Sequence, residues 1–175
     1  MMQILKAGGM DILTDNIRQP DTNNPRGYFE YEKVKSLQKD PGKSGWLAEA
    51  EGKAVKVIIQ LTPYLPLDLN YSVIIMKRNI DEIMLSQEKM IENLGGKKSS
   101  VGNDILKKVF ESQLSKNEEY LSEHSCFKII SINYNELIDS GQSILQNLST
   151  FFDSKLNIKT AAGVIESSLY RSKLS

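Results

Sequence analysis

The 175-residue sequence has few of the residues that several common kinds of functional site require. It contains one cysteine, Cys126, and one histidine, His124. A single cysteine cannot close a disulfide within the chain, and one cysteine with one histidine two positions away is a poor ligand set for zinc. We therefore expect no internal disulfide and no metal site, and we assign a chemical role to neither residue.

The chain also has no excess of charge of either sign and no long apolar run. Lysine plus arginine and aspartate plus glutamate number 22 each, so net charge predicts no general attraction to nucleic acid or to an anionic membrane. No apolar run approaches the roughly 20 residues that a membrane-spanning helix needs. The opening residues, MMQILKAGGM, do not resemble a secretory signal. We expect a cytoplasmic protein that binds neither nucleic acid nor a membrane.

What the sequence does contain is an alternation of short apolar runs with longer helical patterns. This alternation is typical of βαβ units and a mainly parallel sheet, and 40% apolar residues suffice for the core of one domain, residues 1–175. The pattern predicts an α/β fold. The expected strands are 10–15, 53–60, 71–77 and 127–134, and the expected helices are a first one ending at Ala7, then 28–37, 79–94, 102–123, 141–152 and 158–166.

Arg78 stands where a predicted strand passes into a predicted helix, in YSVIIMKRNIDEIMLSQEKM. Ligands of open parallel sheets bind at the carboxyl ends of the strands, and a guanidinium can hold a phosphate through two hydrogen bonds. Ser86 lies further along the same helix and would add a hydroxyl to a ligand lying along it. On spacing alone, the alternative is that Arg78 extends to water and Ser86 is an ordinary polar residue of the helix.

Other candidate sites have weaker support. Gly42-Lys43-Ser44 invites comparison with a phosphate-binding loop, but the preceding glycine and strand are absent, so we expect a surface loop. Glu30 and Glu32 follow a Gly-Tyr-Phe turn. Either is a candidate general base, and the alternative is that both favour the solvated start of a helix.

Taken together, these segments resemble the sulfotransferase family, in particular the bacterial sulfotransferase-like proteins of the P-loop superfamily. The resemblance covers essentially the whole chain and is most specific in the segment around Arg78. Sulfotransferases have an arginine at a strand end and a serine eight residues on, which bind the 3′-phosphate of 3′-phosphoadenosine 5′-phosphosulfate (PAPS), and Arg78 and Ser86 keep that interval. The resemblance thus favours the phosphate-binding interpretation of these two residues. The segments that carry it are MMQILKAGGMDILTD, NNPRGYFEYEKVK, GKAVKVIIQL, YSVIIMKRNIDEIMLSQEKM, INYNELI and VIESSLYRSK.

The resemblance also implies residues beside the adenine of the cofactor. Tyr134 in NYNEL occupies the place of a tyrosine that packs near the adenine in the family. Ser168, in Ser167-Ser168-Leu169, matches a Thr-Ser-Phe-like segment, although leucine replaces the aromatic ring and weakens the stacking argument. The late Arg-Lys-Gly loop of the family has no clear counterpart.

The N-terminal part of the family pattern is absent. In relatives, the segment equivalent to MMQILKAGG follows a strand and a loop that holds the 5′-phosphosulfate, and neither is present here. The resemblance therefore implies a three-layer, P-loop NTPase-like parallel sheet flanked by helices, with the first, central strand and the phosphate loop missing. We expect a truncated version of a longer protein or a weakly stable remnant, unless the strands at 53–60 and 71–77 pair directly.

These features imply a sulfotransferase-like domain that transfers a sulfuryl group from PAPS to a hydroxyl or amine acceptor, without a metal. Arg78 and Ser86 would bind the 3′-phosphate, Tyr134 and Ser168 the adenine, and Glu30 would act as the base. Without the phosphate loop, we expect little or no activity from this chain. The alternatives are a non-catalytic nucleotide-binding or interaction protein of the same fold and, with less support, a kinase of the superfamily. The acceptor and the oligomeric state are not indicated by the sequence.

Overall fold

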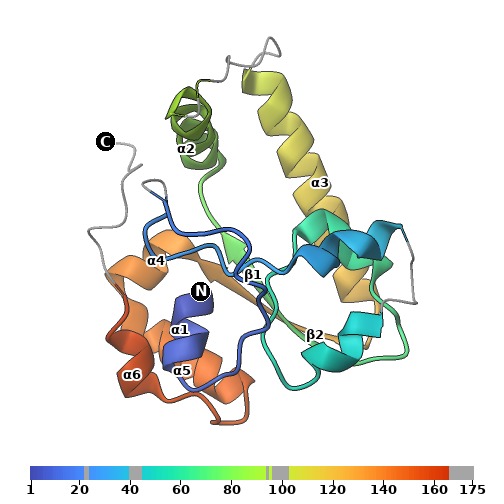
Figure 1. The fold of residues 1–175 in the computed structure, drawn as a ribbon, viewed down its shortest axis with the longest axis vertical. Coiled ribbons are helices and arrows are strands. Elements are labelled where there is room, and N and C mark those ends of the chain that lie inside the picture. The colour runs from blue at the N-terminus through green and yellow to red at the C-terminus, as the bar shows by residue number, and fades with distance from the viewer. Residues whose placement is uncertain (22–23, 40–44, 94, 96–102, 166–175) are drawn as a thin grey trace.

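The protein combines helices with a small parallel sheet (Figure 1). The computed structural model describes residues 1–21, 24–39, 45–93, 95 and 103–165. Strand β1 (Tyr71–Lys77) pairs in parallel with β2 (Phe127–Asn133), in a register that sets Tyr71 opposite Phe127 and Lys77 opposite Asn133. Both strands were predicted from the β-branched, apolar runs YSVIIMK and FKIISINY, and both are confirmed, although β2 ends one residue earlier than predicted. The chain is thus of mixed α/β type.

The other two predicted strands, 10–15 and 53–60, form only an isolated parallel bridge between Ile12 and Ala54. The Ala54 N–H donates to the Asp11 carbonyl at 2.8 Å, and the Leu13 N–H donates to the Ala54 carbonyl at 3.0 Å. The end of the second run was predicted wrongly, because residues 59 and 60 belong to the 3₁₀-helix η3 (Ile59–Tyr64). There the Thr62 hydroxyl donates to the Ile59 carbonyl at 2.7 Å and closes the turn.

The two strand pairs share their apolar surroundings but are not joined to each other. Ile12 and Ala54 pack on one apolar cluster together with residues of β1 and β2, and Leu13, Val55 and Val57 do the same on a second cluster. In the described part of the chain, no backbone hydrogen bond links 53–58 to β1. Direct pairing of these two segments, one of the arrangements considered from sequence, is therefore not formed.

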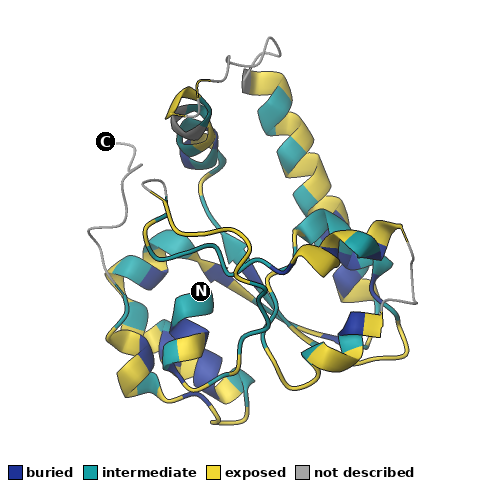
Figure 2. Cartoon of the chain, viewed as in Figure 1, coloured by how far each residue is buried: buried dark blue, intermediate teal, exposed yellow. Residues whose placement is uncertain are grey.

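Helices cover the sheet in two groups, one for each apolar cluster. The first cluster contains Leu137, Leu145 and Leu148, each at most 2% exposed, and the second contains Leu37, Trp46 and Leu121. Figure 2 shows buried segments in the strands and in the helices on both sides of them. The first group comprises α1 (Met2–Ala7), α4 (Tyr134–Asp139), α5 (Gly141–Phe151) and α6 (Ile158–Ala162); the second comprises η1 (Glu32–Gln38), η2 (Gly45–Ala50), η3 and the C-terminal part of α3 (Asn103–Glu123).

Helix α2 (Ile80–Asn93) and the N-terminal part of α3 extend away from this body (Figure 1). An ion pair of 2.7 Å between Lys107 and Asp81 joins them. Both helices were predicted, but the apolar face expected along α3 is only partly buried. Ile105 is 60% exposed and Val109 is 47% exposed, whereas Leu114, Tyr120 and Leu121 in the later turns of the helix pack on the second cluster. The prediction of a helix at 28–37 was also wrong at its start, since η1 begins at Glu32.

Candidate functional site

The clearest cluster of predicted site residues lies where the two paired strands end. Lys77 and Asn133 are opposite each other in the register, so the next residues, Arg78 and Tyr134, leave the same edge of the sheet. The carbon at the centre of the Arg78 guanidinium lies 5.1 Å from the centroid of the Tyr134 ring. At this distance a cation and an aromatic face attract each other. The fold thus brings together two residues that the sequence placed in separate segments.

Glu82 is the third member of this cluster. Its Oε2 accepts a hydrogen bond from Arg78 Nε at 3.1 Å, and its side chain is 4% exposed, against 24% for Arg78. A buried carboxylate requires such a partner, since an unpaired charge out of water is costly. Glu82 was not among the site residues predicted from the sequence, and its pair with Arg78 was missed. The signal that indicates it is the spacing of four residues between the arginine and the glutamate.

Asparagine side chains begin both helices that leave this edge. Asn79 Oδ1 accepts the Asp81 N–H at 2.8 Å, an interaction typical of an N-cap residue. Asn133 Oδ1 accepts the N–H groups of Asn135 at 2.9 Å and of Glu136 at 3.4 Å, so it caps α4, a helix not predicted from the sequence. Because Tyr134 is the first residue of α4, the Asn133 cap positions its ring.

The other two predicted cofactor residues are Ser86 and Ser168. Ser86 is partly buried in α2, and no hydrogen bond within the described residues joins it to Arg78 or Tyr134. Ser168 lies outside the residues that the structure describes, as do Lys43 and Ser44 of the Gly-Lys-Ser tripeptide. The shared binding of one phosphate by Arg78 and Ser86 therefore stays a prediction.

Glu30, the predicted base, lies in a separate ionic cluster. Its Oε1 is 3.4 Å from Arg18 Nη1 and 3.4 Å from Lys56 Nζ. Its main-chain carbonyl accepts the Thr14 hydroxyl at 2.8 Å and the Asp15 N–H at 3.2 Å, which ties this segment to the end of the extended stretch 10–15. The Glu30 carboxylate is thus held by two cations. The other acidic candidate, Glu32, pairs with Lys35 at 2.7 Å.

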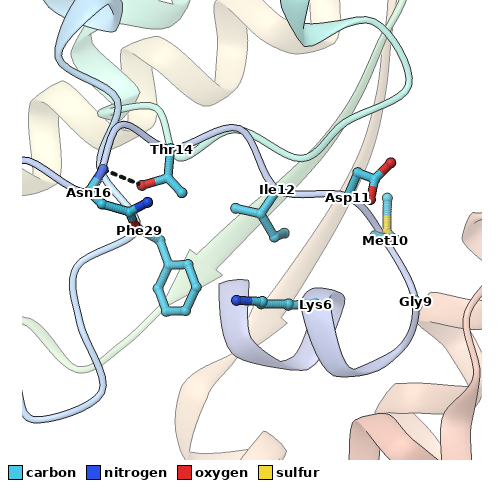
Figure 3. A pocket seen from close by; sticks show the side chains of 8 residues that line it. All are labelled: Lys6, Gly9, Met10, Asp11, Ile12, Thr14, Asn16 and Phe29. Carbon is cyan, nitrogen blue, oxygen red and sulfur yellow. Dashed lines mark hydrogen bonds between the residues drawn. The ribbon is translucent and has the colours of Figure 1, made fainter.

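A cleft of about 410 Å³ is lined in part by Phe29, the residue before Glu30 (Figure 3). Helix α1, the extended stretch that follows it and Phe29 form its walls. No motif in the sequence indicated this cleft. Its lining residues are Lys6, Gly9, Met10, Asp11, Ile12, Thr14, Asn16 and Phe29.

The described ranges also bear on metal binding and on membrane insertion. No group of three or more His, Cys, Asp and Glu side chains within them is placed to hold a metal ion. None of the helices described is both long enough and apolar enough to cross a membrane. Comparison with known proteins found no matching protein-family model, no matching curated protein and no matching solved structure.

Proposed function

We propose that this chain is a sulfotransferase-like domain that binds the 3′-phosphoadenosine part of PAPS at the edge where β1 and β2 end. The observation that carries the proposal is the contact between Arg78 and Tyr134 at 5.1 Å. A cation can bind the phosphate of such a nucleotide and an aromatic ring can pack on its adenine, and these two residues supply both groups close together.

Each residue of the cluster has a role in this proposal. Arg78 would bind the phosphate through its guanidinium, while the bond from Nε to Glu82 at 3.1 Å orients that group. The Tyr134 ring would pack against the adenine. Ser86 would add a hydroxyl only if the ligand extends along α2. The Glu82 carboxylate opposes an anionic ligand, so it would lower the affinity of the site while holding its geometry.

The arrangement of the strands supports the finer fold assignment that belongs to this proposal. The parallel bridge at Ile12 and Ala54 and the parallel pair β1–β2 contribute to the same two apolar clusters, but no hydrogen bond in the described part joins the two pairs. A P-loop NTPase-like sheet without its central strand has this arrangement. We therefore propose that architecture for the domain, with residues 10–15 and 53–58 on one side of the omitted strand.

Transfer of the sulfuryl group to a hydroxyl or amine acceptor is the reaction that the family resemblance implies, with Glu30 as base. The ion pairs of Glu30 with Arg18 and Lys56, both at 3.4 Å, favour the second candidate, a nucleotide-binding protein without transfer activity. A base must reach the acceptor proton, and this carboxylate would first have to leave its two cations. Release of adenosine 3′,5′-bisphosphate from PAPS, measured with hydroxyl and amine acceptors in wild type and Glu30→Gln, separates the two candidates.

Binding is tested by calorimetry with adenosine 3′,5′-bisphosphate and the 175-residue chain. We expect saturable binding that Arg78→Ala weakens at least about tenfold, since it removes the charge-assisted bonds to phosphate. Lys128→Ala is the matched control. Lys128 Nζ also lies over an aromatic ring, Phe151 at 4.9 Å, and near Asp153 at 3.7 Å, but close to the start of β2. Absence of binding by the folded wild type, or equal loss in both variants, would refute the proposal.

A further inference from the structure

Phe29 adopts a backbone conformation that large side chains seldom adopt. Its φ is +51°, and the other non-glycine residues with positive φ in the described part are Asn16, Asp153 and Ser154, all small and polar. Asparagine and aspartate tolerate the left-handed region, whereas a bulky residue there is strained. Such strain persists only where the surroundings hold it, and it is concentrated at functional sites.

Contacts on both sides of Phe29 hold this conformation. Before it, the Tyr28 hydroxyl donates to Asp21 at 2.8 Å, and the guanidinium carbon of Arg18 lies 3.4 Å from the centroid of the Tyr28 ring. After it, the Glu30 carbonyl accepts hydrogen bonds from Thr14 and Asp15. The segment is therefore fixed by its neighbours, and the direction of the Phe29 side chain follows from that.

The Phe29 ring is directed into the cleft rather than into the protein core. It is partly buried, yet it belongs to neither of the two apolar clusters. Figure 3 shows the ring beside the ammonium end of Lys6, with Ile12 nearby. Lys6 Nζ lies 5.9 Å from the ring centroid. Packing in the core therefore does not account for the direction of the ring, and the ring is placed where a ligand in the cleft could stack on it.

The charged groups of the cleft favour an anion as that ligand. Lys6 is exposed and makes no ion pair within the described residues. Asp11, the acidic residue of the lining, directs its carboxylate away from the Phe29 ring (Figure 3). Lys6 supplies the positive charge beside the ring. The Thr14 hydroxyl is neutral and already donates to the Glu30 carbonyl.

We propose that this cleft binds a small, flat monoanion of the aromatic carboxylate class. The ring of the ligand packs on Phe29 and Ile12, its carboxylate pairs with the Lys6 ammonium, and the exposed Asn16 amide lies at the same wall of the cleft. A cleft of about 410 Å³ accommodates a molecule of this size. The site is separate from the Arg78–Tyr134 cluster, and the inference stands without the nucleotide proposal.

The test is a titration of the isotopically labelled 175-residue chain with benzoate, followed by amide chemical shifts. We expect saturable shifts centred on the residues that line the cleft, with a dissociation constant on the order of 1 mM for so small a ligand. Acetate, which has the charge without the ring, and benzyl alcohol, which has the ring without the charge, should each bind at least about tenfold more weakly. Equal binding of acetate, or no saturable shift with benzoate, overturns the proposal.

Two variants test the two halves of the site independently. Lys6→Met removes the charge and keeps an unbranched side chain, and it should weaken benzoate at least about tenfold. Lys159→Met is the matched control, since Lys159 is likewise the basic residue in the last turn of a short helix, α6, outside the cleft. Benzoate binding that Lys6→Met leaves unchanged overturns the proposal.

Phe29→Asn removes the ring and supplies a residue that tolerates a φ of +51°. We expect benzoate binding to be lost while the midpoint of thermal unfolding is kept or raised, because the ring contacts the ligand and does not pack in the core. A clear fall in the midpoint would show that the ring stabilises the fold. That result, or retained binding, overturns the proposal.

Discussion

The Arg78 guanidinium lies 5.1 Å from the centre of the Tyr134 ring and, through Nε, 3.1 Å from the Glu82 carboxylate. One residue follows β1, one begins α4 after β2, and one lies in the first turn of α2. The contact therefore depends on the pairing of the two strands as well as on the starts of the two helices. A change in any of these elements is expected to alter the geometry of the proposed nucleotide site.

Glu82→Gln should affect stability and ligand affinity in opposite directions. The variant keeps the shape of the side chain but removes a charge that is 4% exposed and paired with Arg78, so the free energy of unfolding should fall by about 1–3 kcal/mol. The same charge competes with a phosphate for the guanidinium. Affinity for adenosine 3′,5′-bisphosphate should therefore rise several-fold.

Urea unfolding and calorimetry measure the two effects of Glu82→Gln separately. Glu119→Gln, at an exposed position of α3, is the control for the loss of one negative charge. If Glu82→Gln weakens the nucleotide as well as the fold, the carboxylate positions Arg78 more than it competes with the ligand, and the predicted gain in affinity is wrong.

Asn133→Ala should weaken both α4 and the nucleotide site. The variant removes the side chain that accepts the Asn135 and Glu136 N–H groups, and loss of such a cap costs about 1 kcal/mol. Tyr134 is the first residue of the helix, so its ring should lose its fixed position over Arg78. We expect a lower unfolding midpoint and weaker binding of adenosine 3′,5′-bisphosphate.

The control for Asn133→Ala is Asn157→Ala. Asn157 caps α6 by accepting the Thr160 N–H at 3.2 Å, far from the Arg78–Tyr134 contact in the chain. Both variants should cost similar stability, but only Asn133→Ala should affect the nucleotide. Equal effects on binding would mean that the cap acts through general stability alone.

The sequence predicted the elements that are determined locally. The apolar runs at 71–77 and 127–134 became β1 and β2, and the helix predicted at 79–94 became α2 (Ile80–Asn93). The run at 53–60 has a similar composition, yet it makes only one bridge, through Ala54. Composition identifies residues that suit a strand, whereas a regular strand also requires a partner along its length.

Two residues of the candidate site could be predicted from the sequence, but the contact between them could not. Arg78 and Tyr134 were singled out, but their contact depends on the register that sets Lys77 opposite Asn133, which local patterns do not specify. The burial of Glu82 follows from packing in the same way. Phe29 carries no sequence signal of its left-handed backbone, because its conformation is imposed by contacts with residues distant in the chain, such as Thr14.

Substitution of Gly8 or of Gly9 should destabilise the protein, for different physical reasons. A Cβ on Gly8 would collide with the side chain of Leu156, whose Cγ would be 2.8 Å away, and Leu156 is only 3% exposed. Gly9 has open space around it but a φ of +96°, which alanine adopts poorly. We expect Gly8→Ala to cost about 1–3 kcal/mol by overpacking and Gly9→Ala about 1–2 kcal/mol by backbone strain.

A double-mutant cycle with Leu156→Ala distinguishes the two causes. Removal of the leucine side chain should recover much of the cost of Gly8→Ala, because the two changes share one contact, and should leave the cost of Gly9→Ala unchanged. Chemical unfolding of the five variants and wild type measures both couplings. Coupling of Leu156 to Gly9 as strong as to Gly8 would contradict this assignment.

Ionisation of Tyr71 should make the protein less stable as the pH rises above 10. Burial raises the pKa of its hydroxyl to about 12, and the electrostatic effects of Asp68 and of Cys126 act in the same direction. The hydroxyl donates to the Pro66 carbonyl at 2.9 Å, and the ring stacks on Phe127 at 5.2 Å between centroids. The folded state thus keeps the proton after the unfolded state, with a pKa near 10, has released it.

The sign of this effect follows from proton binding. Between about pH 10 and 12 the unfolded state holds fewer protons than the folded state, so stability is fully present below pH 10 and is lost as the pH rises through 12. Tyr71→Phe keeps the ring stack and removes the titrating group. The variant should lose about 1 kcal/mol of stability at neutral pH because it loses the hydrogen bond, and its unfolding free energy should then depend less on pH in this interval than that of wild type.

Urea unfolding at a series of alkaline pH values, with Tyr64→Phe as the control for removal of a tyrosine hydroxyl elsewhere, gives the comparison. Parallel pH profiles for wild type and Tyr71→Phe would mean that Tyr71 ionises alike in both states and that another group governs alkaline unfolding.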